Sequence, residues 1–532
     1  MKNIIPLISF LTLLFAQYEI EGRWHLVGYE DLVMYQFVDT EPFADAGWRY
    51  TLYSIDGNFG DLDDAGGSPS PYSIVDDIIT IDLFFGNIVS YRVDYRCDGQ
   101  VVDFVYIPDE IIHSTLFKEG FDYFNSDCEA GVIINVPDDY ATIQDGIDAA
   151  SEGDTVLVAA GTYSPSTNNE IFPIEMASGI HLIGSGEDIS IIDAQQTGRV
   201  ITMENCDNNT ISDLTLTGGF TDSYGGGIRL DYSDPVLIHV TISSNTATWG
   251  GGIHSCYSNP TLTHVTISNN EALQGGGMRL VDSSPILTHV TISNNAGSEA
   301  GGMRLFGSNP ILTHVTINGN TTDYYGGAMW LDYSNPTLNH VTISNNVAGY
   351  AGGGMRLSNS NPILRNVTIV NNTAGSYGGG GIYLNSSNPN LTNSIMWGNN
   401  PESIYGDSGT PVITFSDIEG GWEGEGNIND NPLFYDSDNN DYNLQSTSPC
   451  IDSGTVIEGM EYCGYYPDMG AYEYCEEELL GDLNDDGTIN IQDIILTLNL
   501  VLNSEYNSLA DLNDDGTIDV LDIVQIINII LN

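Results

Sequence analysis

The chain repeats one pattern of apolar and polar positions seven times between Tyr224 and about Asn400. Each copy carries a run of glycines, an apolar residue, a variable residue and usually Leu, then Asn-Pro or a close variant, and then a segment like Leu-Thr-His-Val-Thr-Ile-Ser-Asn-Asn. The same proline returns every 25 to 27 residues, as Pro235, Pro260, Pro285, Pro310, Pro336, Pro362 and Pro389. So constant a spacing indicates a repeat architecture in which each copy forms one structural unit.

Within each copy, apolar and polar residues alternate over short runs such as Val265-Thr266-Ile267, and turn residues bound these runs. This pattern predicts short strands and no helix. A unit of this size fits one coil of a parallel β-helix, stacked on the next coil at about 4.8 Å. One coil cannot bury its apolar face alone, so stacking of the coils creates the core.

The segment before the repeats predicts the start of the same solenoid. Ile143, Ile147 and Ala150 follow a helical spacing, and short apolar runs come after them. A short helix followed by irregular coils is typical of a solenoid whose open end must be covered. Residues 131–400 are therefore assigned to a parallel β-helix, and residues 133–400 resemble the pectin-lyase-like right-handed β-helix proteins. The resemblance implies a fold and no single activity, because enzymes, adhesins and structural proteins share this fold.

Two further regions flank the repeats. Residues 18–130 show alternating strands, such as Trp48–Tyr53, and predict a small antiparallel β-barrel or sandwich. Gly22-Arg23-Trp24 resembles the start of lipocalin-like domains, which implies a ligand cup; the alternative is a filled barrel that Trp24 closes at one end. Residues 401–475 resemble the closing segment that follows β-helix repeats in many exported bacterial proteins, and we expect them to cap the last coil.

Charge and the N-terminus restrict the partners. Among 532 residues, 12 are Lys or Arg and 73 are Asp or Glu, for a net charge of −61. Nucleic acid is a poor partner for such a chain, because phosphate binding needs basic clusters, and anionic membranes are disfavoured for the same reason. Residues 1–17 combine Lys2 with a 12-residue apolar run, which predicts a signal peptide, and no other apolar run is long enough to span a bilayer. We therefore expect a secreted protein, extracellular or on the cell surface, without membrane insertion after signal cleavage.

Seven cysteines leave at least one outside intramolecular disulfides. In an oxidising compartment we expect Cys97 to pair with Cys128, and one pair among Cys450, Cys463 and Cys475. Cys206 and Cys256 are two coils apart, which is too far for a disulfide.

The C-terminus carries two copies of a calcium-loop pattern, 29 residues apart. Ca²⁺ binds six to eight oxygens, and this pattern supplies them at loop positions 1, 3, 5, 7, 9 and 12, with Gly at position 6 for a sharp turn. The predicted ligands are Asp482, Asn484, Asp486, Thr488, Asn490 and Asp493 in the first copy, and Asp511, Asn513, Asp515, Thr517, Asp519 and Asp522 in the second. An amphipathic helix is expected after each loop, and none before it.

Tandem loop-helix units with Asp at position 12 resemble a type I dockerin, over residues 476–532. The resemblance implies two bound Ca²⁺ ions and docking to a cohesin-type domain or cell-surface scaffold. The contact positions of that family fall on Ile491, Gln492, Val520 and Leu521, which are mostly apolar here and leave the partner type open. A calcium-stabilised C-terminal anchor is the alternative.

The variable residue after each glycine run forms a column that we call the basic–aromatic column. Its members are Arg229, His254, Arg279, Arg304, Trp330, Arg356 and Tyr383. Their neighbours in sequence are apolar and should face the core, so this column should face outward. Arg binds carboxylate and sulfate groups, and Trp or Tyr stack on sugar rings, so the column predicts polysaccharide binding. The alternative is that each Arg pairs with Asp231, Asp282 or Asp332.

Other columns and absences refine this prediction. His239, His264, His289, His314 and His340, continued by Asn366 and Asn393, indicate an internal polar turn ladder, as does the column from Asn245 to Asn372. No Lys follows Lys118, which excludes a Lys base in the solenoid. The motifs of polygalacturonase-like enzymes and pectinesterases are not seen.

The sequence thus predicts a mainly β protein with a β-barrel, a right-handed parallel β-helix and a small helical calcium-binding module. The expected function is polysaccharide binding or surface adhesion, tethered through the dockerin-like module. A polysaccharide-degrading enzyme, either a lyase or a glycoside hydrolase, is the first alternative, and a structural spacer is the second. A pocket with clustered carboxylates beside the column would favour the enzyme.

Overall fold

A computed structural model describes residues 20, 22–26, 33–40, 43–53, 70–75, 78–82, 88–97, 99–106, 111–121, 132–457, 459–460, 462–475, 480–484, 488–503, 506–513 and 516–531. The chain divides into two compact units, one up to Gly131 and one from Val132. The predicted signal peptide lies outside the described residues. Within the described ranges, no helix is long and apolar enough to cross a membrane.

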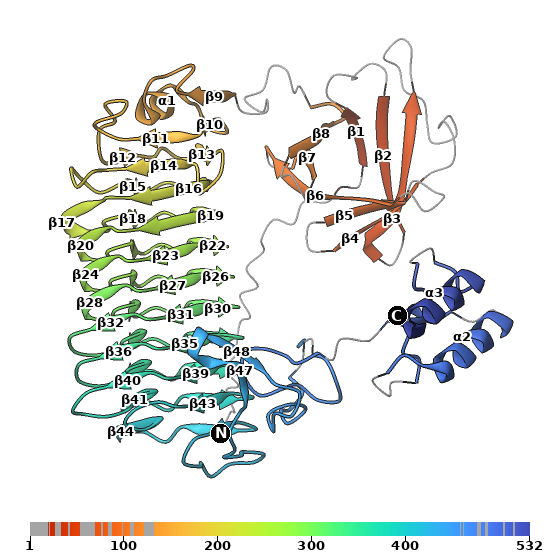
Figure 1. The fold of residues 1–532 in the computed structure, drawn as a ribbon. Coiled ribbons are helices and arrows are strands. Elements are labelled where there is room, and N and C mark those ends of the chain that lie inside the picture. Colours follow the sequence, from red (N-terminus) through yellow and green to blue (C-terminus); the bar gives the residue numbers. More distant parts are fainter. Residues whose placement is uncertain are drawn as a thin grey trace, which may run out of the picture. The chain divides into compact units, whose positions relative to one another are not determined.

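The first unit contains a closed barrel of eight antiparallel strands in sequence order (Figure 1). They are β1 (Gly22–Leu26), β2 (Val33–Thr40), β3 (Phe43–Tyr53), β4 (Ser70–Val75), β5 (Ile78–Asp82), β6 (Ile88–Arg96), β7 (Val101–Tyr106) and β8 (Ile111–Lys118). Trp24 is fully buried in a cluster with Phe37 and Phe104, and its Nε1 donates to the Ile20 carbonyl at 2.7 Å. The predicted antiparallel barrel is confirmed, and buried aromatic side chains occupy its interior.

The second unit is built around a parallel β-helix with three faces. One face has two rows of strands, joined in β16 (Thr210–Thr217) and β19 (Val236–Ser243). The first row also holds β9 (Ile133–Val136), β10 (Thr155–Val158), β13 (His181–Gly184), β22 (Thr261–Thr263), β26 (Ile286–Thr288), β30 (Ile311–Thr313), β34 (Thr337–Asn339), β38 (Ile363–Arg365), β42 (Asn390–Thr392) and β45 (Val412–Thr414). The second row also holds β11 (Gly161–Tyr163), β14 (Ser190–Asp193), β23 (Thr266–Ser268), β27 (Thr291–Ser293), β31 (Thr316–Asn318), β35 (Thr342–Ser344), β39 (Thr368–Val370), β43 (Ile395–Trp397) and β46 (Asp417–Ile418).

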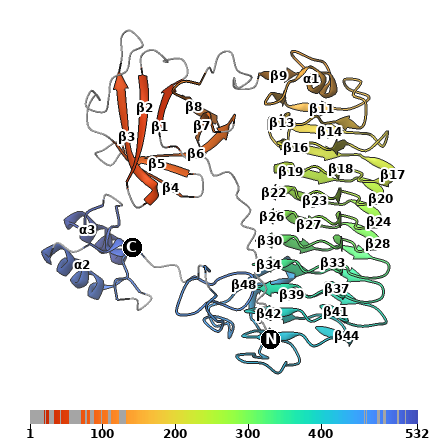
Figure 2. The ribbon, with the colours of Figure 1, turned by 180° about the vertical axis from the view of Figure 1, so that it is seen from behind.

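The other two faces are a ten-stranded and a seven-stranded sheet, whose strands lie one above another in Figures 1 and 2. The ten-stranded sheet contains β12 (Ile174–Glu175), β15 (Ile201–Glu204), β18 (Ile228–Asp231), β21 (Ile253–Cys256), β25 (Met278–Val281), β29 (Met303–Phe306), β33 (Met329–Asp332), β37 (Met355–Ser358), β41 (Ile382–Asn385) and β44 (Ile404–Ser408). The seven-stranded sheet contains β17 (Phe220–Tyr224), β20 (Thr246–Trp249), β24 (Glu271–Gln274), β28 (Ala296–Glu299), β32 (Thr321–Thr322), β36 (Val347–Ala348) and β40 (Thr373–Ala374).

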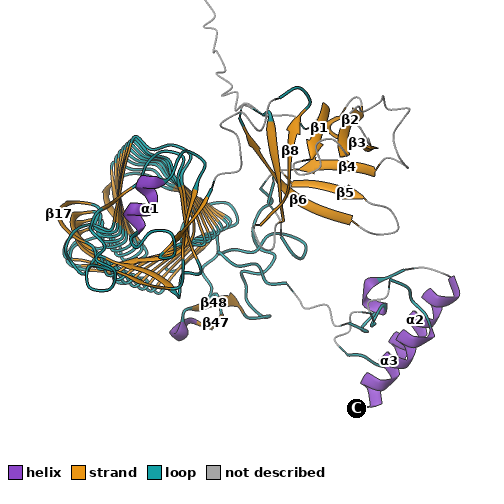
Figure 3. Cartoon of the chain, turned by 90° about the horizontal axis from the view of Figure 1, so that it is seen from above, coloured by secondary structure: helices purple, strands orange, loops and turns teal. Residues whose placement is uncertain are grey.

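The core is one continuous cluster of apolar side chains that runs along the solenoid axis. Leu262, Leu287 and Leu312 stack in register, and all three are fully buried. At the N-terminal end, the predicted helix forms as α1 (Ile143–Ala149), whose Ile143 and Ile147 join this core. In the view along the axis, α1 lies across the opening of the coils (Figure 3).

The seven-stranded sheet turns into the ten-stranded sheet at a corner where only glycine fits. A Cβ added to Gly251 would lie 2.4 Å from the Gly276 carbonyl oxygen and 2.6 Å from that of Glu271. Such a contact is far below van der Waals distance, so any side chain would push the coils apart. The same position is glycine in every copy: Gly226, Gly251, Gly276, Gly301, Gly327, Gly353 and Gly380.

Two polar ladders run along the solenoid, and they differ in burial. The asparagine ladder is buried as predicted: from Asn270 on, each side chain accepts the backbone N–H of the preceding asparagine, at 2.9–3.1 Å. The histidine column occupies left-handed turn positions, with imidazole rings stacked 4.9–5.2 Å apart. The prediction that it lies inside was wrong for its first four members, which are exposed. The last members, Asn366 and Asn393, are buried.

The closing segment covers these last members from the side. Asn366 Nδ2 donates to the Asp468 carbonyl at 3.1 Å, and Thr368 Oγ1 accepts the Ala471 N–H at 2.9 Å. The segment includes a hairpin of β47 (Phe434–Asp436) and β48 (Asp441–Leu444). Ile413 and Ile418 of the segment belong to the main core, and Ile404 and Trp422 pack against it, so the segment closes the last coil as well as covering its side.

The cysteines agree with the sequence wherever the structure describes them. Cys463 and Cys475 form a disulfide, and Cys97 is disulfide-bonded, while its expected partner Cys128 lies outside the described residues. Cys206 and Cys256 are free, as predicted, and Cys450 is free as well.

The C-terminal residues form two helices, α2 (Ile491–Asn503) and α3 (Val520–Leu531). Each begins at the tenth position of one predicted calcium loop, so Asp493 and Asp522 lie in the first turns. Short 3₁₀ turns at Ser437–Asn439 and Ser508–Ala510 are the remaining helical elements of the described ranges.

Replacing Asn295 with Ala should destabilise the solenoid by about 2–4 kcal/mol, because two donors of Asn270 and the Ile267 carbonyl lose their buried partner. Asn309→Ala is the matched control, since Asn309 also accepts one backbone N–H but is exposed to water, and it should cost less than about 1 kcal/mol. Chemical denaturation measures both; equal losses would show that burial of the ladder does not matter.

Candidate functional site

The basic–aromatic column forms as predicted, on the outer side of the ten-stranded sheet. Its members pair in register from Arg229 through His254, Arg279, Arg304, Trp330 and Arg356 to Tyr383. The column faces outward but is partly covered, because His254, Arg304 and Tyr383 are only 3–8% exposed. Side chains from the edge of the seven-stranded sheet, on the far side of the glycine corner, lean over the column.

At the upper part of the column, charge is neutralised within the protein. Arg229 forms ion pairs with Asp231 and, at 2.7 Å, with Glu204. The Tyr224 ring lies against the His254 ring at a tilt of 33°, with centroids 4.6 Å apart. Burial and the nearby arginines lower the pKa of His254 to about 3, so its imidazole is neutral. Its Nδ1 has no hydrogen-bond partner.

In the middle of the column, Arg279 and Arg304 are direct neighbours, as the sequence predicted. Arg304 pairs with Asp332 at 3.3 Å. The Arg279 Nε instead donates to the Gln274 amide oxygen at 3.2 Å, and Gln274 donates to Glu299 at 2.8 Å. Carboxylates therefore compensate the repulsion between the two guanidinium groups, one by direct contact and one through an amide.

At the lower part, Trp330 lies between two guanidinium groups. The guanidinium carbon of Arg304 is 4.1 Å from the Trp330 ring, and that of Arg356 is 4.4 Å from it. Arg356 also lies 4.1 Å from the Tyr325 ring. Among the described residues, Arg356 makes no ion pair, and its buried Nε has no hydrogen-bond partner. Arg356 is thus held by aromatic faces and keeps unused donors.

Exposed tyrosines lie on both sides of the column. Tyr324, Tyr350 and Tyr377 stack at 5.3 and 5.7 Å before the glycine corner, and Tyr232 stacks on Tyr257 at 5.0 Å after the strands. These ladders and the covering residues Tyr224, Tyr325 and Gln274 were not predicted from the sequence. Their constant offset from the glycine run marks them as further columns, but it does not show which of them covers the basic–aromatic column.

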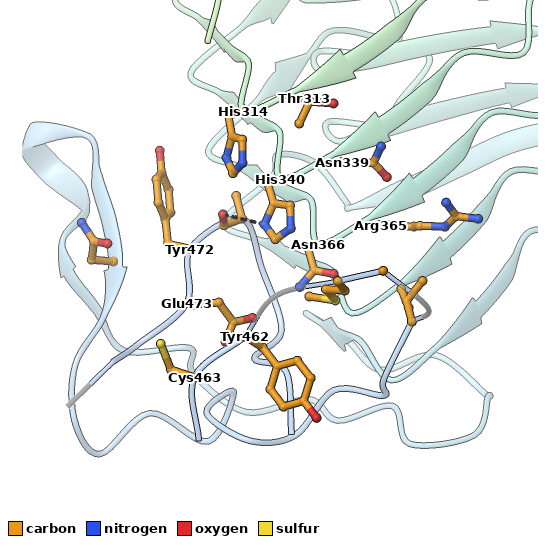
Figure 4. Close-up of a pocket in the computed structure, with 15 residues that line it drawn as sticks. Thr313, His314, Asn339, His340, Arg365, Asn366, Tyr462, Cys463, Tyr472 and Glu473 are labelled. Carbon is orange, nitrogen blue, oxygen red and sulfur yellow. Dashed lines mark hydrogen bonds between the residues drawn. The ribbon is translucent and has the colours of Figure 1, made fainter. Parts of the chain in front are cut away.

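A separate cavity of about 810 Å³ lies between the histidine column and the closing segment (Figure 4). His314, His340 and Arg365 line it from the solenoid, and Tyr472 and Glu473 line it from the closing segment. Burial, reinforced by Asp468, raises the pKa of Glu473 to about 7. Its carboxylate accepts the Asp468 N–H at 3.0 Å. The cavity therefore brings the carboxyl group of Glu473 together with the imidazole rings of His314 and His340 and the guanidinium group of Arg365.

The two calcium loops show matching geometry. In the first, the Asp493 carboxylate accepts the backbone N–H groups of Leu483 and Asn490, both at 2.8 Å. In the second, Asp522 accepts those of Leu512 and Asp519 at 3.0 and 2.9 Å. The loop-opening residues Asp482 and Asp511 and both position-12 residues are buried. Oxygen-only donors with two buried carboxylates in each loop fit Ca²⁺.

The remaining predicted ligands lie on these loops, with two exceptions. Asn484, Thr488, Asn490, Asn513, Thr517 and Asp519 lie on the described parts of the loops. Asp486 and Asp515 lie outside the described residues.

Comparison with known proteins agrees with the solenoid fold. Residues 199–349 and 290–418 match the model of the right handed beta helix region, so this part of the chain is a right-handed parallel β-helix. No curated protein sequence matches the chain.

Several solved structures resemble the chain at low identity. Pectate lyase Pel9A is 14% identical, with 62% of this chain and 90% of that chain covered and a TM-score of 0.43. The GH87 α-1,3-glucanase from Streptomyces thermodiastaticus strain HF3-3 is 13% identical, with coverages of 77% and 81% and a TM-score of 0.31. The polygalacturonase from Erwinia carotovora ssp. carotovora is 13% identical, with coverages of 55% and 97% and a TM-score of 0.28. At this level of similarity these structures carry no inference about activity.

Glu473 should make the closing segment less stable as the pH rises. Because its pKa is raised, the folded protein still holds a proton at a pH where the unfolded chain, above about pH 4.5, has released it. Binding of this proton stabilises the folded state, and the stabilisation is lost as the pH rises toward about 7. Asp417, whose pKa burial raises to about 6, acts in the same direction. We expect the thermal unfolding midpoint to fall between pH 5 and pH 8.

Glu473→Gln should remove part of that fall, about 1–2 kcal/mol for this half-buried group. Exposed Glu423→Gln should behave as the unmodified protein. An unchanged pH dependence in Glu473→Gln would contradict this assignment.

Proposed function

We propose that this protein is an exported, surface-associated protein that binds acidic polysaccharide along the basic–aromatic column. Arg356 is the observation that carries the proposal. Its guanidinium is fixed between Tyr325 and Trp330, and no carboxylate of the described residues pairs with it. Arg279 contacts only a neutral amide among the hydrogen bonds of its side chain. Two oriented guanidinium groups without a direct counter-charge suit carboxylate or sulfate groups of a ligand.

The repeat of the column suits a polymer. Successive coils present cationic and aromatic groups at the regular spacing of β-strands, about 4.8 Å. A chain of sugars offers alternating acidic groups and apolar ring faces along one line. The exposed tyrosine ladders on either side, Tyr324 to Tyr377 and Tyr232 with Tyr257, extend the surface on which rings can stack.

The net charge of −61 opposes binding of an anion at long range. Salt screens such repulsion beyond about 8 Å at physiological ionic strength, whereas direct contacts are screened much less. Five of the chain's 12 basic residues are collected in or beside the column: Arg199, Arg229, Arg279, Arg304 and Arg356. We therefore expect the attraction between these arginines and an acidic polymer to exceed the screened repulsion from the distant acidic surface.

A polysaccharide-degrading enzyme is the second candidate, favoured by the cavity at the closing segment. Glu473, with a pKa of about 7, is suited to accept and donate protons at neutral pH. The carboxylates beside the column do not favour catalysis there, because Glu204, Asp231 and Asp332 are held in ion pairs with arginines. Binding is therefore the first proposal.

For the C-terminal module, we propose two Ca²⁺ ions and docking to a cohesin-type domain or a cell-surface scaffold. The paired carboxylate geometry of Asp493 and Asp522 supports calcium binding. Ile491, Val520 and Leu521, at the starts of the two helices, are apolar and 56–69% exposed, which supports a docking surface there.

Arg356→Ala should weaken binding of a uronic-acid polymer about 10–100-fold, because a charge-assisted bidentate contact contributes about 1.5–3 kcal/mol. Arg92→Ala is the matched control: the same charge is removed from strand β6 of the barrel, at a residue that belongs to neither candidate site. Affinity electrophoresis compares them, and an assay for new reducing ends runs in parallel. Equal binding by Arg356→Ala and the unmodified protein would contradict the proposal, while new reducing ends would establish the enzyme.

Calorimetry of the intact protein should show two tight Ca²⁺ sites, and Asp482→Asn should reduce them to one. Asp323→Asn, an exposed solenoid acid, should leave two. EDTA should also remove hydrogen-exchange protection from α2 and α3, because the loops order both helices. Protection that EDTA does not change would argue against calcium-dependent folding of the module.

A further inference from the structure

Three metal-ligating side chains meet at the upper part of the basic–aromatic column, away from Arg356, which carries the polysaccharide proposal. Asp231 on β18 pairs in register with Cys256 on β21. His254 precedes Cys256 by two residues on the same strand, so both side chains point to the same face. One ligand atom from each of the three residues lies within 4.8 Å of the other two.

His254 and Cys256 both have unused capacity in this cluster. The His254 side chain is 3% exposed, and its Nδ1 has no hydrogen-bond partner. An unpaired buried polar atom costs free energy, so such an atom in a folded protein indicates a missing partner. Cys256 is a free, half-buried thiol.

We propose that Asp231, His254 and Cys256 bind a divalent transition-metal ion of the zinc class. A thiolate, an imidazole and a carboxylate are the ligands that Zn²⁺ takes, and their mixture disfavours Ca²⁺ and Mg²⁺, which bind oxygen. Zn²⁺ holds such ligands at about 2.0–2.3 Å, so the three atoms would sit about 3.3–3.7 Å apart. Side-chain rotations that move the ligand atoms by about 1 Å would bring them to these distances.

Metal binding requires the ion pair between Arg229 and Asp231 to break. Arg229 also contacts Glu204 at 2.7 Å, so it keeps a carboxylate partner after Asp231 turns toward the metal. The Cys256 thiol loses its proton to solvent on binding, and the resulting thiolate with Asp231 balances the two charges of the ion. Three protein ligands leave a fourth position for water or a ligand.

Cobalt titration tests the site in the intact protein, because thiolate ligands give Co²⁺ an intense near-ultraviolet charge-transfer band. We expect this band at one equivalent of Co²⁺, and we expect Zn²⁺ to displace it. Oxygen ligands alone, as in the C-terminal loops, give no such band. The readout is therefore independent of polysaccharide and of calcium.

Cys256→Ser should abolish the band, and His254→Gln should weaken Co²⁺ binding at least tenfold. Cys206→Ser is the matched control, since it removes a free but buried cysteine, and it should keep the band. Circular dichroism of each variant checks that the solenoid is folded. The proposal is overturned if the unmodified protein shows no band, or if folded Cys256→Ser keeps it.

Discussion

Backbone packs directly on backbone at the glycine corner, and this contact fixes the register of the whole solenoid. A Cβ on Gly276 would lie 2.3 Å from the Ala296 carbonyl oxygen, and the other corner glycines are equally confined. Because every coil turns at the same point, each sequence position is brought directly above its equivalent in the preceding coil. Repetition in sequence thereby becomes a column in space: leucine in the core, asparagine at the buried turn, and arginine with aromatics on the outer face.

Stacking at strand spacing also explains the sparse and patterned charge. Identical charged residues at one position would face each other at about 4.8 Å along the solenoid. The column avoids this by alternating Arg with His, Trp and Tyr, and by compensating its one adjacent pair, Arg279 and Arg304, with Asp332 and Glu299. At Arg356 the alternation is kept, but no carboxylate in the described part of the chain pairs with the guanidinium. This exception makes the lower column the strongest candidate for a ligand site.

The sequence predicts the features that the repeat enforces, because periodicity determines both strand and register. The helix α1, the buried asparagine ladder and the outward column followed from spacing alone. Contacts between positions far apart in sequence did not. Spacing could not show that Tyr325 lies over Arg356, nor that Asp468 and Ala471 cover Asn366 and Thr368. The histidines were placed inside because a left-handed turn position carries no signal for the direction of its side chain.

The proposed ligand of the basic–aromatic column is an acidic polysaccharide. The most direct test compares one uronic-acid polymer before and after chemical reduction of its carboxyl groups, with the intact protein in the presence of calcium. The sugar rings stay the same and only the anionic groups are lost. We expect measurable binding of the acidic polymer and loss of that binding after reduction. Equal affinity for both polymers, or affinity for neither, would contradict this proposal.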